Sequence, residues 1–141
     1  MKKSEVKAFL DEKTRQYQQP GFLETDPIQI PHSFDQKEDV EISGFLTATI
    51  AWGNRLSIIR SARQMMDLMD QTPYDYVMNA TESDLGRLEG FVHRTFNAED
   101  FGCFLLSLRH LYLEHGGMEK LFTRYARPDG LQEAITRVRE H

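Results

Sequence analysis

The sequence lacks the features of secreted, disulfide-linked and membrane-spanning chains. Its 141 residues include a single cysteine, Cys103, so no internal disulfide can form, and no CxxC pair exists for zinc. No apolar run approaches the roughly 18 residues that a membrane span requires. The basic start MKKSEVKAFLDEKTRQ has no apolar segment behind it, as a signal peptide would. We therefore expect a soluble, cytoplasmic protein with no membrane partner.

The chain also lacks an excess of positive charge. It has 17 basic and 22 acidic residues, a formal net charge of −5. This balance argues against a protein that coats nucleic acid through its bulk charge, although it leaves room for a local basic patch.

Motifs that carry catalysis or bind cofactors are missing as well. The sequence contains no P-loop, no GxGxxG fingerprint and no GxSxG elbow. It has no HxxxH or HExxH pair, and His110 and His115 lie five positions apart, about 140° around a helix, so they share no ligand face. We predict no metal site and no cofactor, and no catalytic residue can be identified.

What is present is helical periodicity along almost the whole chain, with 40% hydrophobic residues to fill a core. The chain is predicted to be all-α: a single domain over residues 1–141, built as an irregular orthogonal bundle of about seven to eight helices. No segment is expected to form a strand strong enough to begin a β-sheet. The expected helices are Ser4 to about Gln19, Gln36–Trp52, Arg55–Met69, Pro73–Met78, Glu82 to about Glu89, Ala98–His115, Met118–Tyr125 and one that starts near Leu131.

Two of these helices carry the strongest core signals. The helix Gln36–Trp52 is apolar on nearly all sides, which is typical of a buried element. The helix after Asn97 has the clearest amphipathic pattern, Phe101, Phe104, Leu105, Leu108, Leu111 and Tyr112. The methionines Met65, Met66 and Met69 are interpreted as core filler or as an interface stripe.

The first candidate site is the corner between two helices, Trp52-Gly53-Asn54-Arg55. An indole for stacking, followed by an amide and a guanidinium, suits a nucleic-acid base or phosphate. The alternative is purely structural: a core Trp, Gly53 as the residue that ends a helix, Asn54 as the cap of the next and Arg55 on the surface. The sequence leaves both interpretations open.

The second candidate is His93-Arg94, between Phe91 and Phe96 and just before the helix capped by Asn97. An arginine beside a helix N-terminus is typical of a phosphate site. The alternative, which we favour slightly, is two solvated polar residues in a loop held by the two phenylalanines.

The third candidate is the segment Asp26-Pro-Ile-Gln-Ile-Pro-His32. It would place Asp26 or His32 over a pocket, or it is a rigid loop that covers the core. Its two prolines favour the rigid loop.

Part of the chain resembles an uncharacterised bacterial family. Its members carry an aspartate-proline, an isoleucine-proline-histidine and an Ala-Trp-Gly-Asn-Arg block in this order. The resemblance covers most of positions 20 to 125 and is carried by the segments DPIQIPHSF, DVEISGFLTATIAWGNRLSII, PYDYV, FVHRTF and FLLSLRHLYLEHGGMEKLF. It implies no particular activity.

More remotely, the order of elements is similar to the N-terminal half of the helix-hairpin-helix DNA glycosylases. This resemblance implies a domain that acts on nucleic acid, with Trp52 to Arg55 near a lesion pocket or the DNA. The catalytic lysine or aspartate of those enzymes follows a glycine-rich hairpin that has no match here. The resemblance therefore implies the N-terminal portion of a longer protein without the catalytic half.

Three hypotheses follow. The first is a base-excision type, DNA-binding domain that uses Trp52, Asn54, Arg55, His93 and Arg94. The second is a non-enzymatic helical domain that forms homo- or hetero-oligomers through apolar helix faces. The third and least supported is a small-molecule hydrolase that uses His32 and nearby carboxylates.

Overall fold

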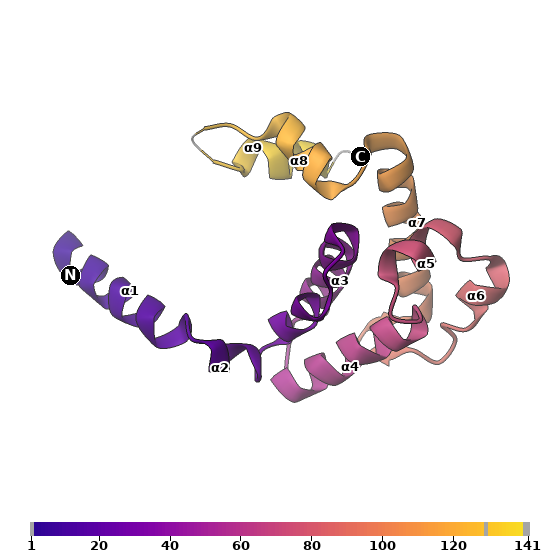
Figure 1. The fold of residues 1–141 in the computed structure, drawn as a ribbon, viewed down its shortest axis with the longest axis horizontal. Helices are drawn as coiled ribbons and strands as arrows, with labels where there is room; N and C mark the ends of the chain where they lie inside the picture. The colour runs from indigo at the N-terminus through magenta and orange to yellow at the C-terminus, as the bar shows by residue number, and fades with distance from the viewer. Residues whose placement is uncertain (1, 129, 140–141) are drawn as a thin grey trace.

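A computed structural model describes residues 2–128 and 130–139 and confirms a packed, mostly helical bundle. In this part of the chain there are nine α-helices, two single-turn 3-10 helices and one short hairpin (Figure 1). The helices are α1 (Lys3–Tyr17), α2 (Pro20–Leu23), η1 (Pro27–Gln29), η2 (Pro31–Ser33), α3 (Lys37–Thr49), α4 (Arg55–Leu68), α5 (Pro73–Asn79), α6 (Glu82–Gly86), α7 (Ala98–His115), α8 (Met118–Tyr125) and α9 (Gln132–Val138). The hairpin consists of β1 (Val92–His93) and β2 (Phe96–Asn97). No described helix is both long and apolar enough to cross a membrane.

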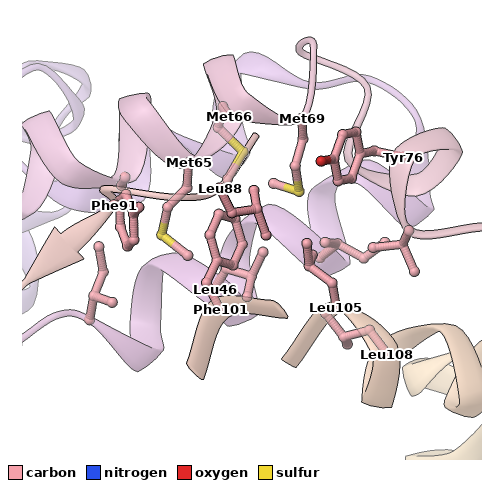
Figure 2. Packing of buried hydrophobic residues seen from close by; sticks show 14 of the residues in the cluster. Leu46, Met65, Met66, Met69, Tyr76, Leu88, Phe91, Phe101, Leu105 and Leu108 are labelled. Atoms are coloured by element: carbon pink, nitrogen blue, oxygen red, sulfur yellow. The ribbon is translucent and has the colours of Figure 1, made fainter. Parts of the chain in front are cut away.

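The core lies between α3, α4, α5 and α7. Figure 2 shows the three methionines of the α4 region, Met65, Met66 and Met69, pointing into this cluster toward Phe101 of α7. Ile30 closes the core from the loop before α3, and Leu88 and Phe91 close it from the segment before the hairpin. The methionines are therefore core residues, one of the two predicted roles.

The helix α1 lies outside this core. None of its residues is buried, and it projects from the bundle at the N-terminal end (Figure 1). Its apolar positions, among them Phe9 and Leu10, remain exposed. It begins one residue before the predicted Ser4 cap, with Lys2 at the N-cap.

The prediction for α3 was wrong in two respects. The helix ends at Thr49, so Trp52 lies beyond it, in the connection to α4. Ile42, Leu46 and Ile50 are fully buried, but Phe45 is 40% exposed. One side of α3 therefore faces solvent and a pocket, and apolar composition alone overstated its burial.

The predicted caps of α4 and α7, Asn54 and Asn97, are confirmed, and Thr81 caps α6. The side-chain oxygen of Asn54 accepts a hydrogen bond from the Ser57 amide at 3.2 Å. Thr81 and Asn97 form reciprocal capping boxes with the third residue of their helices. The local sequence therefore fixes where each of these helices begins.

The hairpin is the element that the sequence did not predict. Two antiparallel residue pairs form it, Val92 with Asn97 and His93 with Phe96. Alternation over two residues is too short to be recognised as a strand pattern. Phe96 packs against Phe91, Phe101 and Phe104, so tertiary packing stabilises a sheet this small.

One buried carboxylate joins the start of α3 to the start of α5. Asp39 is buried, and its Oδ1 accepts a hydrogen bond from the backbone amide of Tyr74 at 2.8 Å. We expect Asp39→Ala to lower the free energy of unfolding by about 1–3 kcal/mol, because the amide loses its acceptor inside the protein. Urea denaturation followed by circular dichroism measures this change. Asp35→Ala, at an exposed position just before α3, is the control; equal losses in both variants would contradict the role assigned to Asp39.

Candidate functional site

The corner between α3 and α4 presents an indole and a guanidinium together. Trp52 is 42% exposed, and the guanidinium carbon of Arg94 lies 5.2 Å from the centre of its ring. A cation over an exposed indole contributes about 0.5–1 kcal/mol. Trp52 is therefore not the core residue of the structural alternative; it lies on the surface beside a cation.

Gly53 makes this approach possible. A Cβ at this position would collide with the guanidinium of Arg94, and Gly53 has φ +112°, which side-chain-bearing residues rarely adopt. The prediction that Gly53 ends the helix was wrong, because α3 ends at Thr49; instead Gly53 leaves the space that Arg94 occupies.

The backbone of Arg94 is held in an uncommon conformation. It has φ +56°, in the left-handed region, and occupies the first position of the two-residue turn between β1 and β2. Such a conformation costs a non-glycine residue about 1–3 kcal/mol and persists only where the surroundings impose it. Glycine or asparagine suits this backbone conformation better, so the packing around the turn imposes it on Arg94.

His93 lies inside the protein rather than in solvent. It is 3% exposed, and its Nδ1 lies 2.8 Å from Oγ of Ser61 on α4. Its ring meets Trp52 edge-on, with centroids 6.1 Å apart. Nε2 has no hydrogen-bond partner in the described part of the chain, which favours the tautomer that carries its proton on Nδ1. His93 is therefore a buried support for the corner, and the prediction of two solvated loop residues was wrong for it.

Beside the corner lies a pocket of about 660 Å³, and Gly53 lines it. Most of its walls are apolar, while Asp26, Thr47 and Arg55 supply polar groups. The hydroxyl of Thr47 is buried and has no hydrogen-bond partner among the described residues. The complete lining is Asp26, Pro27, Ile28, Pro31, Val40, Gly44, Thr47, Ala48, Ala51, Gly53, Arg55 and Ile58.

Asn54 and Arg55 have different roles. Asn54 caps α4, as its structural interpretation predicted. Arg55 is exposed, lines the pocket and lies 3.9 Å from a carboxylate oxygen of Asp26, the edge of ion-pair distance. Such a pair holds Arg55 only weakly, so its guanidinium remains able to bind another anion.

The segment from Asp26 to His32 serves both of its predicted roles in part. Ile30 seals the core, while Asp26, Pro27, Ile28 and Pro31 form one wall of the pocket. His32 is exposed and is not among the residues that line this pocket. In residues 2–128 and 130–139 no group of three His, Cys, Asp or Glu side chains could hold a metal ion. The hydrolase hypothesis gains no support from this geometry.

The sequence did not predict two parts of the site: Ser61, which contacts His93, and the small residues that line the pocket. Ser61 was not singled out, because a serine within an amphipathic helix gives no signal of its partner. The pocket lining did have a signal in the sequence: Gly44 and Ala48, four positions apart, mark a face of α3 with small side chains, and Ala51 follows just beyond the helix. The nucleic-acid hypothesis needs Trp52, Arg55, His93 and Arg94 to line one hollow. Arg94 and Trp52 do meet, but His93 is buried, and of the four only Arg55 lines the pocket.

Comparison with known proteins found one family. The model of a family described as "Protein of unknown function (DUF2400)" matches residues 26–141. Searches of curated proteins and of solved structures returned no match. The match agrees with the resemblance to an uncharacterised family, while the remote similarity to helix-hairpin-helix DNA glycosylases stays a prediction.

Because Trp52 is the single tryptophan, its fluorescence reports directly on the corner. We expect Arg94→Gly to increase acrylamide quenching of this fluorescence, since the guanidinium no longer covers the ring. The free energy of unfolding should change by less than about 1 kcal/mol, because relief of the left-handed backbone offsets the lost cation contact. The control is Arg55→Gln, because glycine at position 55 would destabilise the helix α4. This control should leave the quenching unchanged. Unaltered quenching in Arg94→Gly would mean that Arg94 does not cover Trp52 in solution.

Proposed function

We propose that this chain, which belongs to the DUF2400 family of proteins of unknown function, is a DNA-binding domain that holds an unpaired base. The observation that carries this proposal is the exposed indole of Trp52 under the guanidinium of Arg94, next to Gly53, which lines a pocket together with Arg55. Aromatic rings with neighbouring cations are the common means by which proteins bind single-stranded nucleic acid.

Each group at the corner suits one part of a nucleotide. The indole offers a flat surface for a base, and stacking of this kind contributes about 1–3 kcal/mol per base. The two guanidinium groups of Arg55 and Arg94 are planar donors that match the geometry of a phosphate. Stacking is tolerant of sequence, so we expect little preference among the four bases.

The pocket supports the idea of a base removed from its stack. Its volume of about 660 Å³ lies in the range typical of sites for small molecules, about 300–1,000 Å³. Its walls are mostly apolar, which suits the faces of a base, and they include Thr47, whose buried hydroxyl has no hydrogen-bond partner among the described residues. The similarity to DNA glycosylases, which flip a base into a pocket, favours the same ligand.

The acidic balance of the chain limits the proposal to a local contact. A net charge of −5 opposes binding of a long duplex along the whole surface. An unpaired base bound through stacking needs fewer phosphate contacts than a duplex bound through its backbone. The proposal concerns binding only, because no residue of this chain matches the catalytic lysine or aspartate of the glycosylases.

The direct test is binding of a fluorescently labelled single-stranded oligonucleotide, followed by anisotropy. We expect the wild type to bind single-stranded DNA more tightly than the matched duplex. Trp52→Ala should lose about 1–3 kcal/mol of binding free energy, while Trp52→Phe should retain part of it. A wild type that binds neither DNA, or a Trp52→Ala variant that binds as tightly as the wild type, would falsify the proposal.

The pocket has a separate test in Thr47→Val. Removal of a buried hydroxyl without a partner should raise the free energy of unfolding by about 1 kcal/mol. If that hydroxyl binds the base, the same variant should bind the oligonucleotide up to about tenfold more weakly. Thr49→Val, on the same helix but not among the residues that line the pocket, is the control. A gain in stability with unchanged affinity would place the base outside the pocket.

A non-enzymatic interaction domain remains the second candidate. One observation favours it: the described residues of α1 are all unburied, with Phe9 and Leu10 exposed on one side. Self-association through this helix would appear in sedimentation equilibrium as a mass above that of one chain. Phe9→Ser would then restore the monomer, and a monomeric wild type would remove this candidate.

A further inference from the structure

A second group of arginines lies on the exposed side of α4, beyond the corner. Arg60 and Arg63 are exposed there, next to Leu56, which is 76% exposed. With Ile59, Gln64 and Asp67 these residues line a shallow hollow of about 570 Å³. The helix runs along the lower edge of the bundle in Figure 1.

Two other arginines of the bundle, Arg87 and Arg109, differ from this group in their partners. Arg87 pairs with Asp70 at 2.8 Å, and Arg109 donates to the carbonyls of Val77 and Ala80 at the end of α5. These two side chains stabilise the fold. By contrast, among residues 2–128 and 130–139 no carboxylate lies within ion-pair distance of Arg60, Arg63 or Arg94.

Three arginines lie on α4, the helix that begins at the corner. Arg55 begins the helix beside Gly53, and Arg60 and Arg63, three positions apart, lie on one face. From Arg55 to Arg63 the helix axis advances about 12 Å, at 1.5 Å per residue. Around the helix Arg63 lies about 80° and Arg60 about 140° from Arg55, so the three cations form a broad row spread over one side of α4 beyond the base-binding corner.

One contact keeps part of this row in place. The guanidinium of Arg63 donates to the side-chain oxygen of Gln29 in η1, a neutral partner that leaves its charge uncompensated. The row ends at Asp67, whose carboxylate accepts a hydrogen bond from Gln71 and would repel a phosphate. The cationic surface is thus short, which suits a few nucleotides of single strand rather than an extended duplex.

We propose that Arg60 and Arg63 bind the phosphates next to the nucleotide held at Trp52, so that α4 carries the path of the DNA backbone. This inference rests on the proposed function and adds to it where the strand runs. Phosphate contacts release counterions, whereas stacking of a base does not, so salt distinguishes the two kinds of contact.

The experiment measures the affinity of a labelled single-stranded oligonucleotide as a function of salt for three proteins. For single strands each phosphate contact contributes about 0.7 to the slope of log affinity against log salt. The double variant Arg60→Gln/Arg63→Gln loses two such contacts, so its slope should be smaller by about 1.4. When salt rises from about 50 to 200 mM, the wild type should therefore lose about seven times more affinity than the double variant. Trp52→Ala should bind more weakly with the slope of the wild type.

The matched control is Arg15→Gln/Arg124→Gln, which removes the same charge from α1 and α8. It should leave the slope close to that of the wild type. Circular dichroism and the urea midpoint verify that each variant is folded, which we expect because Arg60 and Arg63 are exposed.

The outcomes separate the two proposals. A wild type that binds the oligonucleotide, with equal slopes for the wild type and Arg60→Gln/Arg63→Gln, would overturn the backbone path along α4 and leave the base-binding corner standing. Equal losses of slope in both double variants would show a nonspecific effect of charge and would also overturn it. A wild type that binds no nucleic acid would overturn both proposals.

Discussion

The hydrogen bond between His93 and Ser61 holds the hairpin against α4, and the geometry of the corner depends on it. Both side chains are buried, and the two residues are 32 positions apart in the chain. With His93 fixed inside, the alternation of a strand turns its neighbours outward, and Arg94 in the following turn reaches the indole of Trp52. The buried imidazole of His93 thus anchors the hairpin, and the exposed guanidinium of Arg94 completes the surface beside Trp52.

Several features of the corner reduce stability, which is characteristic of functional sites. Arg94 has a left-handed backbone, Thr47 buries a hydroxyl without a partner, and an aromatic ring is left on the surface. For Thr47 a simpler replacement, valine, is expected to raise the free energy of unfolding. Thr47 lines the pocket, and Trp52 and Arg94 adjoin it through Gly53, which supports the proposal of a ligand site here.

The distribution of charge follows the same logic. The chain is acidic overall, yet Arg60 and Arg63 on α4 and Arg94 in the hairpin have no carboxylate within ion-pair distance in the described structure. Elsewhere arginine stabilises the fold, as in the pair of Arg87 with Asp70, where the guanidinium lowers the pKa of the carboxyl. A local patch can attract an anion despite a negative net charge, because screening in physiological salt limits each charge to a range of about 8 Å.

The sequence by itself determined the helical class, the beginnings of α4, α5, α6 and α7, and the faces of α4 and α7 that enter the core. These features depend on caps and periodicity within a few residues of one another, so the local sequence is sufficient to predict them. It also singled out Trp52, Arg55 and Arg94 by type. Only the tertiary structure decided that Trp52 is exposed, that His93 is buried against Ser61, and that the hairpin forms. Those outcomes depend on contacts between segments far apart in the chain, whose closeness no local pattern records.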